Sequence, residues 1–325
     1  MPHDGRRIAR RSALALLGAS AALPRPARAQ SWPQRTVRVI VPYGAGGATD
    51  TMCRMICTQL TSRIGQPFVV ENRTGAGGAI GAEAVARATD GHTLLFAAGG
   101  VFNALPRMQK LGFDPVADLT GISIVGVNGM LLGVREDFPA RDLAEFVAYA
   151  KAHPGELNCG SSSIGTSSHL APLMLMVKAG IDIVMVPYPS VPAAIADVLG
   201  GRIQVHFGSP ADIIPQMGKG IKVLANSGAR RSPQVPDIPT VAETYPGGVY
   251  EAWNGFFAPR DTPQAVIGML SQHIVAIVKE AEMGQRFAAL GIDATGTTPE
   301  EVVATIAREA PVYEASLKAA GLMKN

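Results

Sequence analysis

Two glycine-rich turns contain the residues whose types and spacing could do chemistry. The first, Tyr43-Gly44-Ala45-Gly46-Gly47, follows the apolar run Val37–Val41, and the second runs from Ser161 to Ser168. Each predicts a buried strand, a turn rich in backbone N–H donors and the start of a helix. N–H groups at a helix start favour anions, and glycine lets a ligand approach the backbone closely. The sequence therefore predicts that the two turns hold a carboxylate or phosphate from two sides.

Other residues are expected to support the same ligand. Asp50 would repel an anion, so we expect its carboxylate to cap the following helix or to brace the turn. His169 is expected to make a structural hydrogen bond, and Trp253 to pack in the core. Tyr188 either covers the ligand or fills the core with its hydroxyl at the edge. The predicted ligand contacts are Tyr43, Gly44, Ala45, Gly46, Gly47, Ala97, Ala98, Gly99, Ser161, Ser162, Ser163, Gly165, Thr166, Ser168, Tyr188 and Ser209.

Two enzymatic interpretations of the turns are disfavoured by the sequence. Gly44-x-Gly46-x-x-Thr49 is one residue short of a dinucleotide-binding pattern, with Glu71 placed where a ribose-binding acid would lie, but the third position is Thr. Ser161, Ser162 or Ser163 with His169 supplies two members of a hydrolase triad. The sequence there is not G-x-S-x-G, and no acid is assigned to the histidine. We therefore expect a binding protein that is not an enzyme, with no cofactor and no metal.

Residues 1–29 have the pattern of a cleavable export signal. Four arginines within residues 6–11 precede an apolar stretch over 13–23 that is too short to span a membrane, and Ala27-Arg28-Ala29 fits the cleavage pattern. Arg10-Arg11 leaves the twin-arginine and general secretory routes both open. The leader holds six Arg and one Asp, so its removal changes the formal charge from +3 to −2 and removes any argument for nucleic-acid binding. We expect an exported, periplasmic, monomeric protein that starts at Gln30.

The three cysteines are expected to be small buried apolar residues. Cys53 and Cys57 are four positions apart on a predicted helix, a geometry that rarely suits a disulfide, and Cys159 would have no partner. No Cys or His spacing resembles a zinc site.

Strand and helix patterns alternate almost throughout, which predicts an α/β fold. Two apolar runs within 122–134, broken by Asn128-Gly129, predict either a domain crossing or a hairpin. A return strand at 253–258 predicts one lobe from 30–130 with 252–325, and a second lobe from 131–251. The expected strands are 37–41, 68–70, 93–97, 156–160, 183–186, 203–207, 222–225 and 253–258; the expected helices are 50–64, 79–88, 142–152, 166–178, 193–199, 211–217, 264–279, 283–290 and 300–319.

On these segments the chain resembles the substrate-binding receptors of tripartite tricarboxylate transporters, the Bug receptor family. The order and spacing of the matching segments are specific, although each one alone is weak. They are Val41-Pro42-Tyr43 to Gly46-Gly47-x-x-Asp50, Val70-Glu71-Asn72-Arg73-x-Gly75-Ala76-Gly77-Gly78, Asp90-Gly91-His92-Thr93-Leu94-Leu95, Pro154-Gly155-x-Leu157, Gly160-Ser161 to Gly165-Thr166-Ser167-Ser168-His169-Leu170, Val186-Pro187-Tyr188 and Pro236-Asp237-Ile238-Pro239-Thr240-Val241-x-Glu243.

The resemblance implies a two-lobe, Venus-flytrap-like periplasmic-binding-protein fold, each lobe a sheet flanked by helices. It further implies a receptor for a small organic carboxylate, for uptake with small and large membrane subunits or for sensing. The chain departs from the family pattern at Pro189-Ser190, where a basic residue and Gly are common, and at Ser162-Ser163. Both departures bear on the ligand, which stays open between a dicarboxylate, an amino acid and an aromatic acid.

Overall fold

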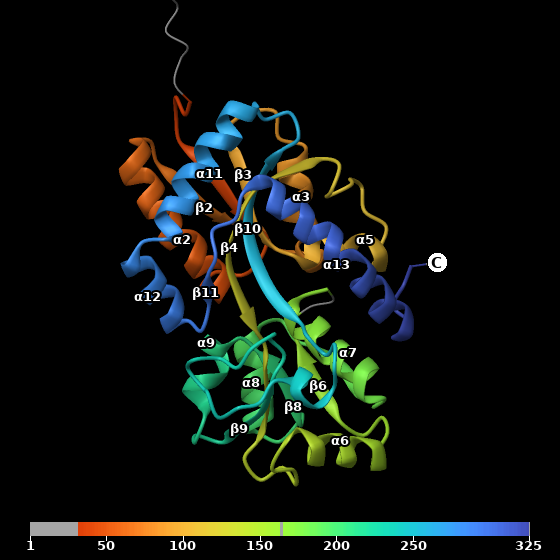
Figure 1. The fold of residues 1–325 in the computed structure, drawn as a ribbon. Helices are drawn as coiled ribbons and strands as arrows, with labels where there is room; N and C mark the ends of the chain where they lie inside the picture. The colour runs from red at the N-terminus through yellow and green to blue at the C-terminus, as the bar shows by residue number, and fades with distance from the viewer. Residues whose placement is uncertain (1–31, 163–164, 325) are drawn as a thin grey trace, which may run out of the picture. The chain divides into compact units, whose positions relative to one another are not determined.

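The computed structural model describes residues 32–162 and 165–324. The predicted export signal, its cleavage site and Ser163 lie outside the described residues. Residues 35–325 form one compact unit, which contains two β-sheets and the helices that pack on them (Figure 1). The predicted α/β class is therefore confirmed.

The first sheet has six strands in the order β11-β4-β10-β3-β1-β2. β1 pairs in parallel with β2 and β3, whereas β10 pairs antiparallel with β3 and β4. The chain returns to this sheet after forming the second one, as Figure 1 shows for the long strand β10. The strands are β1 (Val37–Val41), β2 (Phe68–Asn72), β3 (Thr93–Ala98), β4 (Leu119–Gly129), β10 (Glu251–Pro259) and β11 (Asp293–Ala294).

Helices cover the first sheet because its strands alternate apolar side chains between two faces. On one face, Ile40 and Leu95 join an apolar cluster with Ala82 and Val302 from two helices. On the other face α2 and α11 pack together. The helices of this part are α2 (Ala48–Ile64), η2 (Ala76–Gly78), α3 (Ala79–Ala86), α4 (Gly100–Asn103), α5 (Leu105–Met108), α11 (Gln264–Val278), α12 (Ala281–Ala289) and α13 (Pro299–Ala319).

The second sheet has five strands in the order β7-β6-β8-β5-β9. Its apolar side chains again form two clusters, one with α6 and α7 and one with α8 and α9. The elements are β5 (Leu131–Arg135), α6 (Leu143–Ala152), β6 (Asn158–Ser161), α7 (Ser167–Ala179), β7 (Val184–Pro187), α8 (Val191–Leu199), β8 (Val205–Gly208), α9 (Pro210–Ile213), η3 (Ile214–Gln216), β9 (Ile221–Asn226) and α10 (Val241–Thr244).

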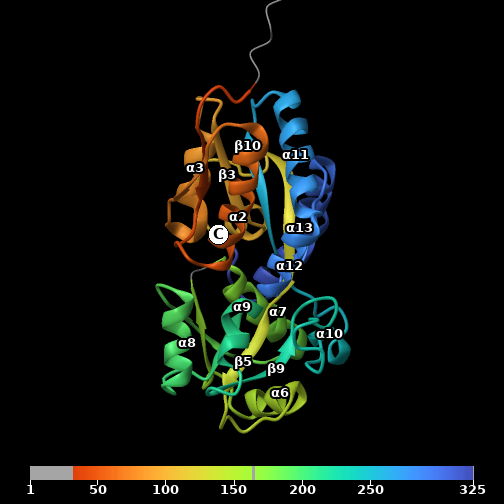
Figure 2. The ribbon, with the colours of Figure 1, turned by 90° about the vertical axis from the view of Figure 1, so that its left-hand side faces the viewer.

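For residues 122–134 the sequence allowed either a domain crossing or a hairpin, and the structure shows a crossing between the two sheets. β4 belongs to the first sheet and β5 to the second, with only Met130 between them (Figure 2). The hairpin alternative is therefore wrong. The boundaries of the two predicted lobes remain a prediction.

α13 packs against the first sheet and against α7, a helix that packs on the second sheet. Val302 near its start packs in the first-sheet cluster, whereas Tyr313 and Leu317 share an apolar cluster with Leu170 of α7. Ser316 Oγ also lies 3.7 Å from Met174 Sδ. The last helix therefore joins the packing of the first sheet to that of α7.

One predicted helix is wrong in extent. The segment predicted as a helix over 211–217 contains only the single turn of α9, followed by the 3₁₀ turn η3. Pro215 explains the break, because proline lacks an N–H and its ring clashes with the preceding turn of a helix. The short elements α4, α5, α10, β11 and η2 were not expected, since pieces of two to four residues leave no periodic pattern.

Within the described ranges, no helix is long and apolar enough to cross a membrane.

Candidate ligand-binding site

The first glycine turn joins the buried strand β1 to the start of α2. Gly46 has a φ of +82°, a conformation that side-chain-bearing residues rarely adopt. α2 begins after Gly47, and the structure gives this helix no side-chain cap. An ideal Cβ on Gly44 or Gly46 would meet no atom within 4 Å, so space is open beside both residues. The turn is therefore accessible to a ligand at its glycines.

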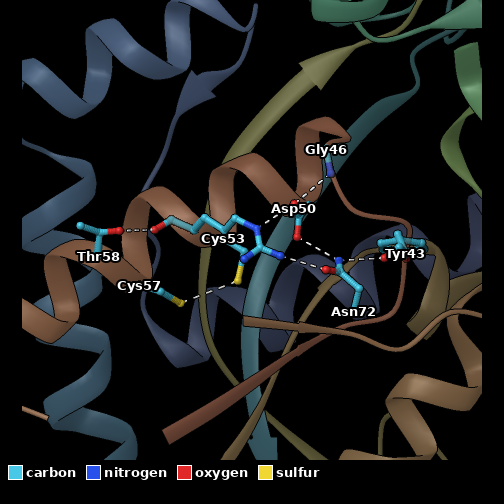
Figure 3. A network of polar contacts seen from close by, with 8 residues as sticks. Tyr43, Gly46, Asp50, Cys53, Cys57, Thr58 and Asn72 are labelled. Carbon is cyan, nitrogen blue, oxygen red and sulfur yellow. Dashed lines mark hydrogen bonds and ion pairs between the residues drawn. The ribbon is translucent and has the colours of Figure 1, made fainter. Parts of the chain in front are cut away.

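Asp50 braces this turn from the first turn of α2. Its Oδ2 accepts the backbone N–H of Gly46 at 2.9 Å and the Arg54 Nε–H at 2.9 Å, and its Oδ1 accepts from Asn72 Nδ2 at 2.9 Å. Asn72 Nδ2 also donates to the Tyr43 carbonyl at 3.0 Å, and Arg54 Nη2 donates to Asn72 Oδ1 (Figure 3). Both ends of the turn are thus tied to one side-chain network.

The charge of Asp50 is balanced within the same network. Burial alone would raise the pKa of Asp50, but the hydrogen bonds from Arg54, Gly46 and Asn72 outweigh it and lower the pKa. The carboxylate is 3% exposed and ion-paired with Arg54. An incoming anion would therefore not meet an unbalanced negative charge at this position.

The backbone donors available at the first turn differ from those expected. The N–H of Gly46, which we expected to face the ligand, is already bonded to Asp50. Within the described residues, the N–H groups of Ala48, Thr49 and Asp50 at the start of α2 have no protein acceptor. Among the described residues, these orphan donors, rather than the Gly46 N–H, are therefore the ones open to an anion.

The loop after β3 lies next to Tyr43. Burial raises the pKa of the Tyr43 hydroxyl well above its ordinary value, although the backbone N–H of Ala98 acts in the opposite direction. Ala98 is half-buried, whereas the side chain of Ala97 is fully buried in the first-sheet cluster. Ala97 could therefore reach a ligand only through its backbone.

The second glycine turn is filled by hydroxyl groups that bond one another. Ser168 Oγ accepts the N–H of Ser162 at 3.0 Å and lies 3.1 Å from Ser162 Oγ. Thr166 Oγ1 lies 3.3 Å from Ser162 Oγ and 3.2 Å from Ser168 Oγ. Ser161, in β6, is 2% exposed. The turn offers hydroxyls that can rotate to suit a ligand, in contrast to the backbone donors of the first turn.

His169 lies at the start of α7 as a neutral group. Burial lowers its pKa to about 4, and its Nδ1 accepts the N–H of Gly165 at 3.4 Å. The side chain is 4% exposed. At neutral pH the second turn therefore receives no positive charge from this histidine.

The structure brings the second turn against the loop that begins α4. A Cβ on Gly100 would overlap the carbonyl oxygen of Gly165, and a Cβ on Gly165 would lie 2.7 Å from Leu105 Cδ2. Ser167, at the start of α7, is a hydrogen-bond partner of the Tyr250 hydroxyl. Two parts of the chain predicted to share one ligand, 97–99 and 161–168, are therefore close neighbours.

Two more distant candidates are occupied by contacts within the second-sheet part. The Tyr188 hydroxyl donates to Asp197 Oδ2 at 2.8 Å, and its ring is half-buried. The Ser209 hydroxyl donates to Asp212 Oδ2 at 2.6 Å. A ligand that used either hydroxyl as a donor would have to replace these bonds.

The geometry also bears on the enzymatic interpretations. β1 lies between β2 and β3, so the strand order is not the 3-2-1 order of a dinucleotide-binding sheet, and Glu71 lies 3.7 Å from Arg38 in an ion pair. Among described residues, no serine hydroxyl bonds His169. Neither arrangement is therefore assembled in the described parts of the chain.

All three cysteines are free and buried. Cys53 Sγ and Cys57 Sγ lie 3.8 Å apart, as Figure 3 shows beside the Asp50 network. In residues 32–162 and 165–324, no group of three or more His, Cys, Asp or Glu side chains could hold a metal ion.

Sequence reasoning did not single out Asn72, Arg54 or Gly100. Asn72 and Arg54 carried a usable signal, since the motif Glu71-Asn72-Arg73 and the Asp50/Arg54 spacing of four positions on a helix were both visible. Gly100 lies one position beyond the predicted contacts Ala97, Ala98 and Gly99. Its contact with Gly165 joins residues far apart in the chain, so no local pattern could have shown it.

Solved structures with this arrangement are periplasmic binding proteins. An R. palustris protein with adipate is 29% identical, with a TM-score of 0.84 over 90% of this chain and 99% of that chain. The periplasmic binding protein BugD is 30% identical, with a TM-score of 0.82 over 90% and 100%. MatC from Rhodopseudomonas palustris with bound malate is 31% identical, with a TM-score of 0.81 over 88% and 100%. The predicted periplasmic-binding-protein fold is therefore confirmed.

The family follows from the sequence matches. The model of the tripartite tricarboxylate transporter family receptor matches residues 52–321. Protein BugT of Bordetella pertussis is 33% identical over 304 residues, which cover 91% of this chain and 93% of that protein. This chain belongs to the tripartite tricarboxylate transporter receptor family, as its motifs suggested.

Proposed function

We propose that this protein captures a small organic carboxylate between its two glycine turns, as a receptor that changes nothing in its ligand. The observation that carries the proposal is the start of α2, where three backbone N–H groups without a protein acceptor follow a turn braced by Asp50. Such a group of oriented donors favours a carboxylate without any arginine. The chain belongs to a family of transporter receptors, and this membership supports a binding role.

The two turns would have different parts in capture. The first turn would hold one carboxylate of the ligand through the N–H groups at the start of α2, and the backbone at Ala98 and Gly99 would support the turn. The second turn would then contact the ligand through Ser161, Ser162, Thr166 and Ser168. Closure of the two proposed lobes, 30–130 with 252–325 and 131–251, would be favoured because the ligand touches both turns only in the closed state.

Dicarboxylates are the first ligands to test. Two similar structures contain adipate and malate, which both carry two carboxylates on a short chain. Hydroxyls of the second turn can donate to a second carboxylate or to a ligand hydroxyl. We therefore propose that this chain takes a small dicarboxylate, with the chain length set by the second turn.

The biological setting forms part of the same proposal. The Arg-rich leader would direct export to the periplasm, with cleavage before Gln30 and the mature chain acting as a monomer. A small and a large membrane subunit would receive the ligand for uptake, or the loaded receptor would act in sensing. N-terminal sequencing of periplasmic material tests the cleavage site, and an uncut chain retained in the cytosol would contradict it.

Calorimetry with matched ligands tests the capture proposal. Malate and adipate should bind, whereas their dimethyl esters, which lose the charge and gain one methyl group on each carboxyl, should bind at least about tenfold more weakly. Mass spectrometry of the recovered ligand should show it unchanged. Equal affinity for acid and ester would show that the orphan N–H groups do not recognise a carboxylate, and turnover lost in Ser161→Ala would instead support a hydrolase.

A further inference from the structure

Glu309 is a half-buried carboxylate that the proposed ligand contacts do not use. It lies on α13, and its Oε2 and Oε1 accept the indole N–H of Trp253 at 2.9 and 3.1 Å. Asn103 Nδ2 lies 3.4 Å from Oε2, which is a long contact. Trp253 and Asn103 are 2% and 1% exposed, and they come from β10 and α4. One carboxylate therefore joins three elements of the first-sheet part.

The Trp253 ring supports the loop predicted to touch the ligand. A Cβ on Gly99 would lie 2.6 Å from Cζ2 and 2.7 Å from Nε1 of the indole, so only glycine lets the ring lie this close. The Gly99 N–H also donates to the Trp253 carbonyl at 3.1 Å. The next residue, Gly100, faces the Gly165 carbonyl of the second turn. Contacts thus run from Glu309 through the indole and the Gly99–Gly100 backbone to the second turn.

We propose that Glu309 is a positioning residue for ligand capture, which holds the Trp253 ring against Gly99 and so sets where the next residue, Gly100, meets the second glycine turn. The inference rests on the proposed function, because it assumes that the loop at 97–99 belongs to the ligand site. Glu309 itself touches no ligand in this scheme.

The surroundings of Glu309 make this hold sensitive to pH. Burial raises its pKa and Glu251 adds to the effect, while Trp253, Arg308 and Asn103 act in the opposite direction, and the net shift is upward. Tyr250 and Tyr313 also lie near it and are uncharged at neutral pH, and burial raises the pKa values of both hydroxyls further. Arg107 is directed to the Asn103 carbonyl at 2.8 Å rather than to Glu309.

An unpaired acceptor beside Glu309 favours a carboxyl that takes up a proton readily. Among the described residues, Asn103 Oδ1 is one of two buried side-chain atoms without a partner, so the cluster is short of donors. A charged carboxylate accepts the indole N–H about twice as strongly as a neutral one. The hold on Trp253 should therefore weaken as pH falls through the raised pKa of Glu309, and ligand affinity should fall with it.

Tryptophan fluorescence gives a direct reading of this contact. The chain has two tryptophans, Trp32 and Trp253, so Trp32→Phe leaves the indole under study as the single emitter. We then follow the emission of Trp32→Phe against pH without ligand. The emission maximum of Trp253 should shift in one transition as Glu309 changes charge, because a charge beside the indole nitrogen changes the energy of the indole's excited state. Glu309→Gln, which keeps an acceptor and cannot titrate, should abolish that transition.

Ligand binding then tests whether the contact matters for capture. With malate and adipate as probes, Glu309→Leu should weaken binding about fivefold or more, since the indole loses its acceptor. Glu309→Gln should restore affinity to within about twofold of the parent at high pH and show less pH dependence. Glu300→Gln is the matched control on the same helix, because Glu300 is exposed in the first turn of α13, and this variant should leave affinity unchanged.

The outcomes separate this inference from the capture proposal. If the parent protein binds the probes and both Glu309 variants bind them equally well at every pH, the positioning role is wrong. An emission transition that persists in Glu309→Gln would equally overturn it. The parent protein could instead bind no carboxylate while the emission transition behaves as expected. The capture proposal would then be wrong, and the bond from Trp253 to Glu309 would be a structural contact with no part in ligand binding. Thermal melts identify any variant that fails to fold, and Trp253→Phe provides a second route to removing the bond.

Discussion

The two glycine turns look alike in sequence but are held in different ways. The first is braced by a charged network in which Asp50 accepts three hydrogen bonds from Gly46, Arg54 and Asn72. The second is filled by the hydroxyls of Ser162, Thr166 and Ser168, which bond one another. A charged brace fixes backbone donors in one geometry, whereas hydroxyls can exchange partners. The first turn thus suits an invariant carboxylate, and the second suits variation in the rest of the ligand.

The largest effect should come from removing the brace of the first turn. Asp50→Ala removes the charged acceptor that Gly46, Arg54 and Asn72 share, so the free energy of unfolding should fall by about 1.5–3 kcal/mol. Hydrogen bonds lower the pKa of Asp50 despite burial, so its contribution exists above the ordinary carboxylate pKa and is lost as pH falls through the folded value. Urea denaturation at neutral and acidic pH measures both effects.

The exposed Asp261 supplies the control for that experiment. Asp261→Ala should change the free energy of unfolding by no more than about 0.5 kcal/mol. Equal losses in the two variants, or an Asp50→Ala loss that does not shrink in acid, would show that the network does not hold the turn.

Gly46→Val should have the next largest effect, on affinity. The φ of +82° is strained for valine, and its side chain would enter the open space beside the turn. Binding of malate or adipate should weaken about tenfold or more, equivalent to about 1.4 kcal/mol. Gly268→Ala in α11, where a Cβ also meets nothing within 4 Å, should leave affinity unchanged by calorimetry. Unchanged affinity in Gly46→Val would remove the first turn from the site.

Gly100→Ala tests whether the two turns must approach each other. The new methyl group would overlap the Gly165 carbonyl, so the loop and the second turn should separate and affinity should fall about fivefold. Small-angle scattering with saturating malate should show a less compact protein than the parent. Normal affinity with normal compaction would mean that this contact is not needed for the bound state.

Ser162→Ala should have a smaller effect and should change selectivity. The hydroxyl bonds Ser168 and Thr166, and its loss should cost about 0.5 kcal/mol of binding. We expect the ratio of malate to adipate affinity to change more than the mean affinity. If the affinities for malate and adipate fell by the same factor, the second turn would bind a carboxylate common to both ligands, as the first turn is proposed to do.

The smallest effect is expected from the titration of His169. Burial lowers its pKa to about 4, so the ring should stay neutral and its NMR signals unchanged across the neutral range. Its folded pKa lies below the ordinary value, so it makes the fold less stable as pH falls below about 6.5. A titration midpoint near the ordinary value would give the second turn a positive charge and remove the contrast between the turns.

Much of the fold could be predicted because its signals are local. β1 over 37–41 and the start of α13 agree with the structure, where Thr298 Oγ1 accepts the N–H of Glu301 and Pro299 occupies the first turn. These features depend on periodicity and on capping residues within a few positions of one another. Pro215 could have stopped the overlong helix prediction, because the rule that breaks helices at proline is equally local.

The sequence by itself determined the α/β class, the family, and which turns are rich in glycine and serine. Only the tertiary structure decided that Asn72 joins Asp50 to the Tyr43 carbonyl, that Gly100 meets Gly165, and that Glu309 holds Trp253. Propensity and capping act between residues close in sequence, so they leave a pattern. These three outcomes depend instead on which donors remain unpaired and which surfaces touch once the chain is packed, and burial makes each such pairing energetically decisive.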